Sequence, residues 1–205
     1  MRAIRIYIEG GGDSADTKAI LRRGFNGLLR ELRATAQQRR IAWTIVLCGS
    51  RERTFDNFLT ALQTHRDALN VLLVDAEGPV TGAPWEHLRR RDGWQRPEDV
   101  VDEQCHLMVQ SMEAWIVADV EALRAYYGAQ LNANPLPRTA QIETVDRQRI
   151  AAALAEATRP TRKGRYHKID HAADLLELLN VARVRAAAPH CDRLFTVLLA
   201  KMCEP

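Results

Sequence analysis

The chain has 205 residues, a formal net charge of +3, 46% hydrophobic residues and 27% charged residues. This balance excludes intrinsic disorder and collagen-like repetition, and no apolar run reaches the ~20 residues that a bilayer-spanning helix needs. The four cysteines are far apart and the N-terminus has no continuous apolar segment, so we expect a cytoplasmic protein with no disulfide framework, signal peptide or membrane contact.

The first two thirds of the chain alternate strand-like and helix-like segments. Short apolar runs predict strands at residues 4–8, 42–48, 71–74 and 105–109. Apolar residues at helical spacing predict helices around residues 20–32, 55–62 and 112–127. Strands that alternate with helices are typical of an α/β protein with a mainly parallel sheet flanked by helices. The continuous apolar run at 71–74 indicates a strand buried on both faces.

Two irregular segments interrupt this pattern. Residues 76–104 form a long connection rich in glycine and proline, and residues 128–140 have the composition of a linker. After the linker, helical spacing returns at residues 150–157, 172–180 and 192–202. We therefore divide the chain into an α/β core at residues 1–127 and a helical C-terminal extension at residues 141–205, which we expect to pack on the core.

Acidic residues follow three of the predicted strands. Glu9 ends the first strand, with Asp13 four residues later; Asp75 ends the third, with Glu77 two residues later; Glu113 follows the fourth. Ligands of open α/β sheets bind at the carboxyl ends of the strands, so all five carboxylates are expected at one edge. Crowded carboxylates repel one another, and a hard divalent cation, Mg²⁺ or Mn²⁺, relieves the repulsion. Two such ions also support phosphoryl transfer.

The glycine triplet Gly10, Gly11 and Gly12 follows the first predicted strand. Its lack of side chains permits a tight turn and a close approach of the backbone to a phosphate. The triplet is not a Walker A loop, because no Gly-Lys-Ser/Thr follows it, and it does not match the dinucleotide-binding Gly-x-Gly-x-x-Gly pattern.

Five short motifs span most of the chain: IYIEGGGD at residues 6–13, LVDAEGP at 73–79, WEHL at 85–88, SMEAW at 111–115 and YHK at 166–168. Their order and spacing resemble a bacterial Toprim-like family of unknown function, related to the Toprim domains of overcoming-lysogenization-defect nucleases. The resemblance implies a Rossmann-like Toprim core and phosphodiester chemistry. It also suggests bacterial (phage) defence with a separately encoded ATPase, since this chain has no P-loop of its own.

The resemblance also implies residue roles. The five carboxylates named above would hold one or two Mg²⁺ or Mn²⁺ ions, and Glu9 would be catalytic as well. Lys168 would be the cation that stabilises the transition state, and Ser111 matches the serine of the Ser-x-Glu motif. The chain departs from the family pattern at Glu77, where aspartate is usual. The longer side chain implies a shifted metal geometry or the loss of one metal site.

Further candidates for substrate contact are Gly10, Gly11, Gly12, Ser111, His87, Arg89, Arg90 and Arg91. Each candidate also has a structural interpretation. Acids at strand ends form helix caps and turns, Ser111 suits a helix N-cap, and a charge run often forms a solvated face.

The leading functional hypothesis is a metal-dependent nuclease that hydrolyses phosphodiesters in DNA or RNA. The alternative is a non-catalytic subunit that binds nucleotide or nucleic acid in a complex with a separate ATPase. A phosphatase-like hydrolase is the weakest hypothesis, because the segment that begins at Asp75 lacks the Asp-x-Asp-x-Thr/Val nucleophile motif. The sequence does not indicate the oligomeric state.

Overall fold

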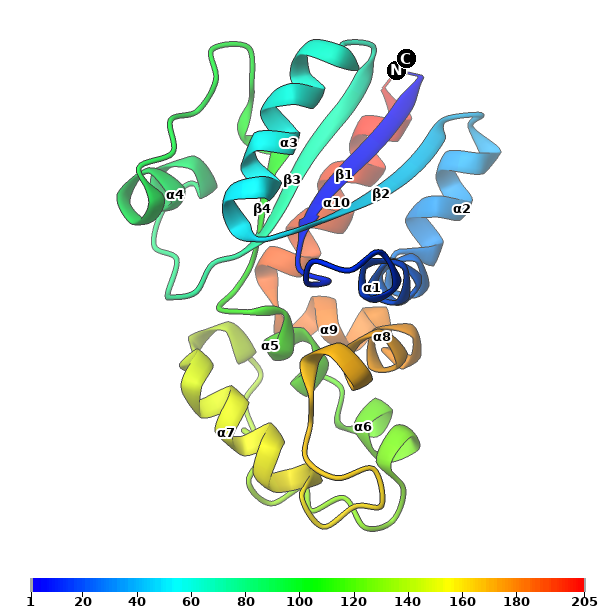
Figure 1. Cartoon of the computed structure of the whole chain (residues 1–205), viewed down its shortest axis with the longest axis vertical. Helices are drawn as coiled ribbons and strands as arrows, with labels where there is room; N and C mark the ends of the chain where they lie inside the picture. Colours follow the sequence, from blue (N-terminus) through cyan, green and yellow to red (C-terminus); the bar gives the residue numbers. More distant parts are fainter. Residues whose placement is uncertain (1, 205) are drawn as a thin grey trace.

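The four apolar segments form one parallel sheet within residues 2–204, which the computed structural model describes (Figure 1). The strand order is β2-β1-β3-β4, and every pairing is parallel. The predicted α/β fold class, with its parallel sheet and helical C-terminal part, is therefore confirmed. The strands are β1 (Ala3–Glu9), β2 (Ala42–Gly49), β3 (Ala68–Asp75) and β4 (Cys105–Met108).

Side chains on both faces of the sheet are buried, as the apolar run at 71–74 predicted. Val71 and Leu73 of β3 belong to one apolar core, while Leu72 and Val74 belong to a second core on the other face. The alternation follows from the two-residue period of a strand. The strand order places β1 and β3 in the middle of the sheet, and each strand has side chains in both cores.

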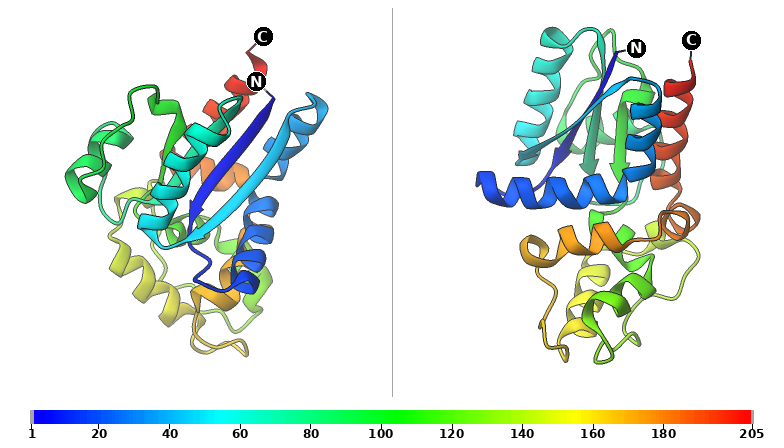
Figure 2. Two further views of the ribbon diagram at one scale, coloured as in Figure 1. Left: turned by 45° about the horizontal axis from the view of Figure 1, so that its top comes forward. Right: turned by 90° about the vertical axis from the view of Figure 1, so that its right-hand side faces the viewer.

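Helices cover the two faces of the sheet (Figure 2). Helices α3 (Arg51–Thr64) and α4 (Pro84–Asp92) lie on one face, while α2 (Arg30–Gln38) and α10 (Pro189–Cys203) lie on the other. Helix α1 (Ala15–Leu28) crosses below the sheet, near the carboxyl ends of the strands.

A second group of helices lies beyond the carboxyl ends of the strands (Figure 1). Its members are α5 (Met112–Val117), α6 (Val120–Tyr127), α7 (Arg147–Thr158), α8 (Lys168–Leu178) and α9 (Val181–Ala187). Helix α8 packs along α1, and α10 returns to pack on β4. The C-terminal helices thus contact the sheet half of the molecule through α8 and through α10.

The close packing of α1 on α8 depends on glycine. A Cβ atom added at Gly24 of α1 would lie 2.6 Å from the Cα atom of Ala173 in α8. The two backbones approach so closely that no side chain fits between them at this point. This packing sets the position of α8, whose first residue is Lys168.

Three expectations about the elements are wrong in detail. The helix expected at 112–127 breaks at Ala118 and Asp119, and the helix expected around 20–32 breaks at Leu29. At the first break, the buried carboxylate of Asp119 accepts hydrogen bonds from the backbone N–H of Asn180 and from Arg183. The connection at 76–104 is not irregular throughout, because it contains α4. Short 3₁₀ turns lie at Asp102–Gln104 and Ile142–Thr144.

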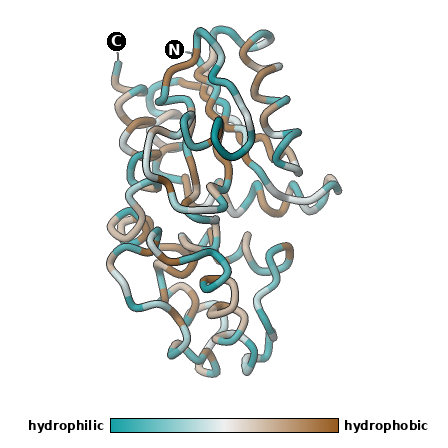
Figure 3. The backbone as a smooth tube through the Cα atoms, turned by 90° about the vertical axis from the view of Figure 1, so that its left-hand side faces the viewer, coloured by the Kyte–Doolittle hydropathy of each residue, from teal (hydrophilic) through white to brown (hydrophobic). Residues whose placement is uncertain are grey.

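Hydrophobic and hydrophilic residues alternate along the helices instead of forming one long apolar segment (Figure 3). Among residues 2–204, no helix has both the length and the apolar character that a membrane crossing requires.

Candidate functional site

The topology of the sheet places Glu9 and Asp75 beside each other. Strand β1 lies between β2 and β3, so the connections after β1 and after β2 lead to opposite sides of it. In open α/β sheets, ligands bind at such a switch point, outside the carboxyl ends of the strands. Glu9 ends β1 and Asp75 ends β3, so both carboxylates lie at this point.

Three of the five predicted carboxylates meet here, and we call Glu9, Asp75 and Glu113 the carboxylate cluster. The backbone N–H of Asp75 donates to Glu9 Oε2 at 3.2 Å. Asp75 Oδ1 accepts from the backbone N–H of Met112 at 2.8 Å, and this bond fixes the start of α5, which carries Glu113. Asp75 Oδ2 lies 3.2 Å from Lys168 Nζ, which lies 3.5 Å from Glu113 Oε1. Lys168, the cation expected from the sequence, therefore contacts the carboxylate cluster.

Two further residues, Arg51 and Tyr166, contact the carboxylate cluster. Arg51, the first residue of α3, donates from Nη1 to Glu9 Oε2 at 2.9 Å and to the backbone oxygen of Asp75 at 2.6 Å. The opposite side of its guanidinium binds both carboxylate oxygens of Asp92. The hydroxyl of Tyr166 donates to Glu113 Oε1 at 3.3 Å.

Sequence reasoning missed Arg51 and Asp92 as members of this site. A signal for Arg51 was present: it follows the carboxyl end of β2 by two residues, at the same sheet edge as the acids. The prediction of the site considered only the acidic residues at the strand ends, and it therefore left Arg51 out. Asp92 lies at the end of α4, and no local pattern links it to Arg51, which is 41 positions away in the sequence.

The electrostatics of the cluster are unfavourable for its negative charges. Burial raises the pKa of Glu9, Asp75 adds to this effect, and Arg51 opposes it. Burial also raises the pKa of Asp75; Lys168 opposes this, and Glu113 adds to it. Burial alone would lower the pKa of Lys168, but Asp75 and Glu113 raise it above its ordinary value. Lys168 is therefore a cation at neutral pH.

The other two predicted ligands lie outside the cluster. Asp13 is 86% exposed and pairs with Arg53 at 2.8 Å. Glu77 pairs with Arg91 and, at 3.2 Å, with Arg147 of α7. Glu77 was expected at the same edge as Asp75, but β3 ends at Asp75 and the chain turns at Glu77, which has a left-handed φ of 55°. Asp13 follows the glycine turn, and its partner Arg53 lies in the first turn of α3.

Some of the residues expected to contact substrate already bind other groups of the protein, and others are exposed. The His87 ring is hydrogen-bonded to the backbone oxygen of Ala76, and Arg91 pairs with Glu77 and Asp92. Arg90 pairs with Glu86 but is exposed, as is Arg89. Ser111 is buried and precedes α5, with no side-chain capping bond to that helix.

The glycine triplet forms the turn that the sequence predicted. Gly10, Gly11 and Gly12 all have positive φ, and Gly10 exchanges backbone hydrogen bonds with Gly49 at the end of β2. A Cβ atom at Gly11 would lie 3.0 Å from the Cα atom of Lys18 in α1. The turn therefore packs on α1, and the Gly10 amide is already occupied.

The carboxylate cluster offers oxygen donors, but cations of the protein already contact them. Within residues 2–204, no three His, Cys, Asp or Glu side chains already stand in an arrangement that could hold a metal ion. Lys168 Nζ lies near both Asp75 and Glu113, and Arg51 contacts one oxygen of Glu9. The three carboxylates of the cluster still outnumber the two cations that contact them, and one of these cations, Arg51, also binds Asp92. Mg²⁺ and Mn²⁺ prefer such oxygen donors. An ion would compete here with the ammonium of Lys168.

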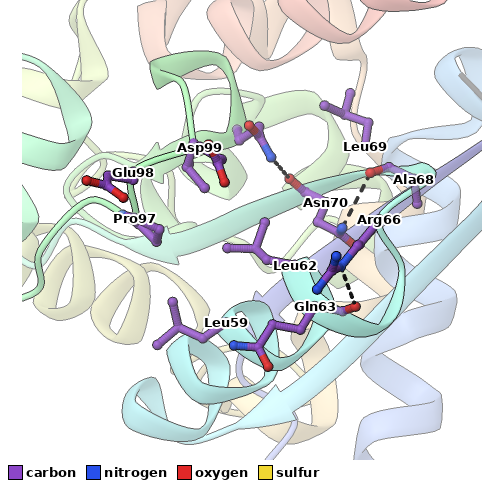
Figure 4. Close-up of a pocket in the computed structure, with 12 residues that line it drawn as sticks. Leu59, Leu62, Gln63, Arg66, Ala68, Leu69, Asn70, Pro97, Glu98 and Asp99 are labelled. Atoms are coloured by element: carbon purple, nitrogen blue, oxygen red, sulfur yellow. Dashed lines mark hydrogen bonds between the residues drawn. The ribbon is translucent and has the colours of Figure 1, made fainter.

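A cavity of about 730 Å³ lies at the opposite end of the sheet (Figure 4). Its lining includes Leu62 and Arg66, Asn70 near the start of β3, and Pro97 and Asp99 of the 76–104 connection. None of the residues singled out from the sequence lines it. The cavity is therefore separate from the carboxylate cluster.

Residues 8–199 match the family model described as "Domain of unknown function (DUF4276)". No curated protein and no solved structure matches the chain. The family match covers the carboxylate cluster together with Arg51 and Lys168. Because the match extends over most of its length, the chain belongs to the DUF4276 family.

Proposed function

We propose that this protein is a metal-dependent nuclease with a Toprim-like site, which hydrolyses phosphodiesters in DNA or RNA. The observation that carries the proposal is the meeting of Glu9, Asp75 and Glu113 around Lys168 at the switch point of the sheet. An excess of carboxylates that are buried or largely buried, beside one accessible cation, suits both a divalent metal ion and an anionic substrate. The five motifs that resemble Toprim-like proteins favour the same chemistry.

The cluster would hold Mg²⁺ or Mn²⁺ through Glu9, Asp75 and Glu113. When bound, such an ion supplies charge neutralisation for the phosphate and makes water a stronger nucleophile at neutral pH. Glu9 Oε2 already accepts hydrogen bonds from Arg51 and from the Asp75 backbone, so Glu9 is held in one orientation. Arg51 acts on Glu9 in this way as a positioning residue.

Hydrolysis needs a proton acceptor and a cation for the phosphoryl oxygens. Water attacks phosphorus, a new P–O bond forms, and the ester P–O bond breaks. Glu9 is the carboxylate that we propose accepts the proton of the attacking water. Lys168 stabilises the negative charge that develops on the phosphoryl oxygens. The leaving oxygen takes its proton from solvent.

Two further elements of the proposal concern the substrate and its setting. The exposed Arg89 and Arg90 of α4 are candidates for contacts with nucleic-acid phosphates. We also propose a cytoplasmic location, which the free thiols of all four cysteines support. A role in bacterial defence with a separate ATPase remains part of the proposal through the resemblance.

The test is cleavage of labelled single- and double-stranded DNA and RNA by the purified protein with Mg²⁺, Mn²⁺ or EDTA. The matched variants are Asp75→Asn in the cluster and Asp13→Asn outside it. We expect metal-dependent cleavage that Asp75→Asn abolishes and Asp13→Asn leaves unchanged.

Two results would count against the proposal. Cleavage that survives in Asp75→Asn would identify a contaminating nuclease. Absence of cleavage by folded protein, combined with binding of the same nucleic acids, would favour the non-catalytic subunit that acts with an ATPase.

A further inference from the structure

The first turn of α8 carries Lys168, and an unusual set of hydrogen bonds holds this turn. The His171 Nδ1 atom lies 3.2 Å from the backbone nitrogen of His167, the residue that precedes the helix. The same Nδ1 atom lies 2.9 Å from the hydroxyl of Tyr127 at the end of α6. His171 thus connects the start of α8 to a neighbouring helix.

The protonation of His171 follows from these partners. A backbone N–H can only donate, so His171 Nδ1 must be an unprotonated acceptor, and the Tyr127 hydroxyl donates to it as well. The side chain of His171 therefore returns to the backbone N–H at the helix start, as the glutamate of a capping box does. The imidazole must be neutral to make both bonds.

The neighbouring residues connect this arrangement to the carboxylate cluster. Tyr166, two residues before Lys168, donates from its hydroxyl to Glu113 and from its backbone N–H to Thr158 Oγ1 at 2.7 Å. The rings of Tyr166 and His171 lie 6.2 Å apart. The chain from Tyr166 to His171 is therefore held at both ends, with Lys168 between them.

We propose that His171 is a positioning residue for Lys168: the neutral imidazole holds the start of α8 so that the ammonium of Lys168 reaches Asp75 and Glu113. When His171 gains a proton on Nδ1, the N–H of His167 faces a donor and its bond is lost. Lys168 then loses its fixed position. The catalytic consequence rests on the function proposed above, whereas the placement of Lys168 does not depend on it.

The surroundings of His171 keep it neutral over most of the pH range. Burial lowers its pKa below the ordinary value, Asp170 and Asp174 oppose this shift, and His167 and Lys163 add to it. The aromatic groups that face its ring are Tyr126, Tyr127 and Tyr166. Protonation therefore belongs to the acidic range, below the ordinary pKa of histidine.

The chain offers a direct readout of Lys168 that needs neither metal nor nucleic acid. It contains four lysines, so protein labelled with ¹³C at the lysine ε-carbons gives four lysine signals. The loss of one signal in Lys168→Arg assigns Lys168. Lys18 and Lys201 are internal controls. The experiment is a pH titration of the full chain in EDTA, with the ring signals of His171 followed in parallel.

The variants separate a positioning role from simple stability. His171→Asn places an oxygen near the Nδ1 position and accepts both hydrogen bonds without titrating, whereas His171→Phe keeps a ring without an acceptor. In the wild type, we expect the Lys168 signal to shift at the pH where His171 titrates. In His171→Asn that step is lost while the neutral-pH signal is retained, and in His171→Phe the signal is displaced at every pH.

Two results would overturn the proposal. One is a Lys168 signal that does not respond when His171 titrates in the wild type. The other is a step of unchanged position in His171→Asn, which would assign the step to the carboxylates. The titrations of the wild type and of His171→Asn are sufficient to test the role of His171, so the test does not depend on whether His171→Phe folds. A protein that behaves as proposed but cleaves nothing would refute the nuclease alone.

Discussion

The two cations of the carboxylate cluster are held in opposite ways. The side chain of Arg51 is 8% exposed and forms a two-sided ion pair with Glu9 and Asp92. The side chain of Lys168 is 46% exposed and contacts Asp75 and Glu113 through one ammonium group. Arg51 begins a helix that packs on the sheet, while Lys168 begins a helix that comes from the C-terminal part of the chain.

This difference separates a structural cation from an exchangeable one. The planar guanidinium of Arg51 serves four acceptor atoms on Glu9, Asp75 and Asp92, and its loss would remove the buried cation that holds these groups together. In the function proposed above, the half-exposed ammonium of Lys168 would exchange the cluster for a phosphate or give way to a metal ion with little cost in stability. Substitutions at Arg51, Lys168, Glu9 and Asp13 test this division.

Arg51→Met should be the most damaging single change. It removes a buried cation and leaves Glu9 with only the backbone N–H of Asp75 and Asp92 with only Arg91, so we expect a loss of about 3–5 kcal/mol in the free energy of unfolding. Urea denaturation measures the loss. Lys168→Met should cost no more than about 1 kcal/mol in the same measurement. Equal losses in the two variants would remove the distinction.

Lys168→Met should instead act on chemistry and on metal affinity. Without the ammonium, the cleavage rate should fall about 100-fold or more, as for the removal of a group that stabilises transition-state charge. Mg²⁺ should bind more tightly, because nothing competes for Asp75 and Glu113. Single-turnover kinetics and a Mg²⁺ titration test the two effects separately, and weaker Mg²⁺ binding would contradict the competition.

Glu9→Gln should stabilise the metal-free protein at neutral pH by a few degrees of melting temperature, while it weakens metal binding. The pKa of Glu9 is raised in the folded state, so its protonated form stabilises the fold below the unfolded pKa of about 4.5. This contribution disappears as the pH rises through the folded pKa. Melting temperatures in EDTA between about pH 4 and pH 8 should therefore fall less in Glu9→Gln. Melting temperatures that fall equally with pH in the wild type and in Glu9→Gln would contradict this prediction.

Asp13→Asn should have the smallest effect. Its ion pair with Arg53 is exposed, so the free energy of unfolding should change by less than about 0.5 kcal/mol and the Mg²⁺ affinity should be unaltered. Thermal unfolding with and without Mg²⁺ provides the measurement. A clear loss of metal-dependent stabilisation would return Asp13 to the set of ligands.

Much of the fold could be predicted from periodicity. The run from Val71 to Val74 predicted a strand buried on both faces, and β3 is that strand. The breaks at Leu29 and Asp119 could not be predicted in this way, because helical spacing continues across both. The break at Asp119 goes with contacts to Asn180 and Arg183, about 60 positions away in the sequence.

Residues of the candidate site could be predicted where they lie at the end of a strand. Glu9 and Asp75 end adjacent parallel strands, so topology alone brings them together. Glu77 was misplaced because the chain turns after Asp75, and sequence spacing does not report that turn. Arg51 was accessible to the same reasoning and was missed because only acids were considered. The partnership of Arg51 with Asp92 depends on how α4 packs, which no local motif encodes.

We propose above that the carboxylate cluster is a divalent metal site, and direct metal binding tests this most directly. Mn²⁺ binding to the full chain would be followed by electron paramagnetic resonance for the wild type, Asp75→Asn and Asp13→Asn. These two variants make the same chemical change inside and outside the cluster. We predict saturable binding that Asp75→Asn abolishes and Asp13→Asn leaves intact. No saturable binding by the wild type, or equal binding by wild type and Asp75→Asn, would contradict the claim.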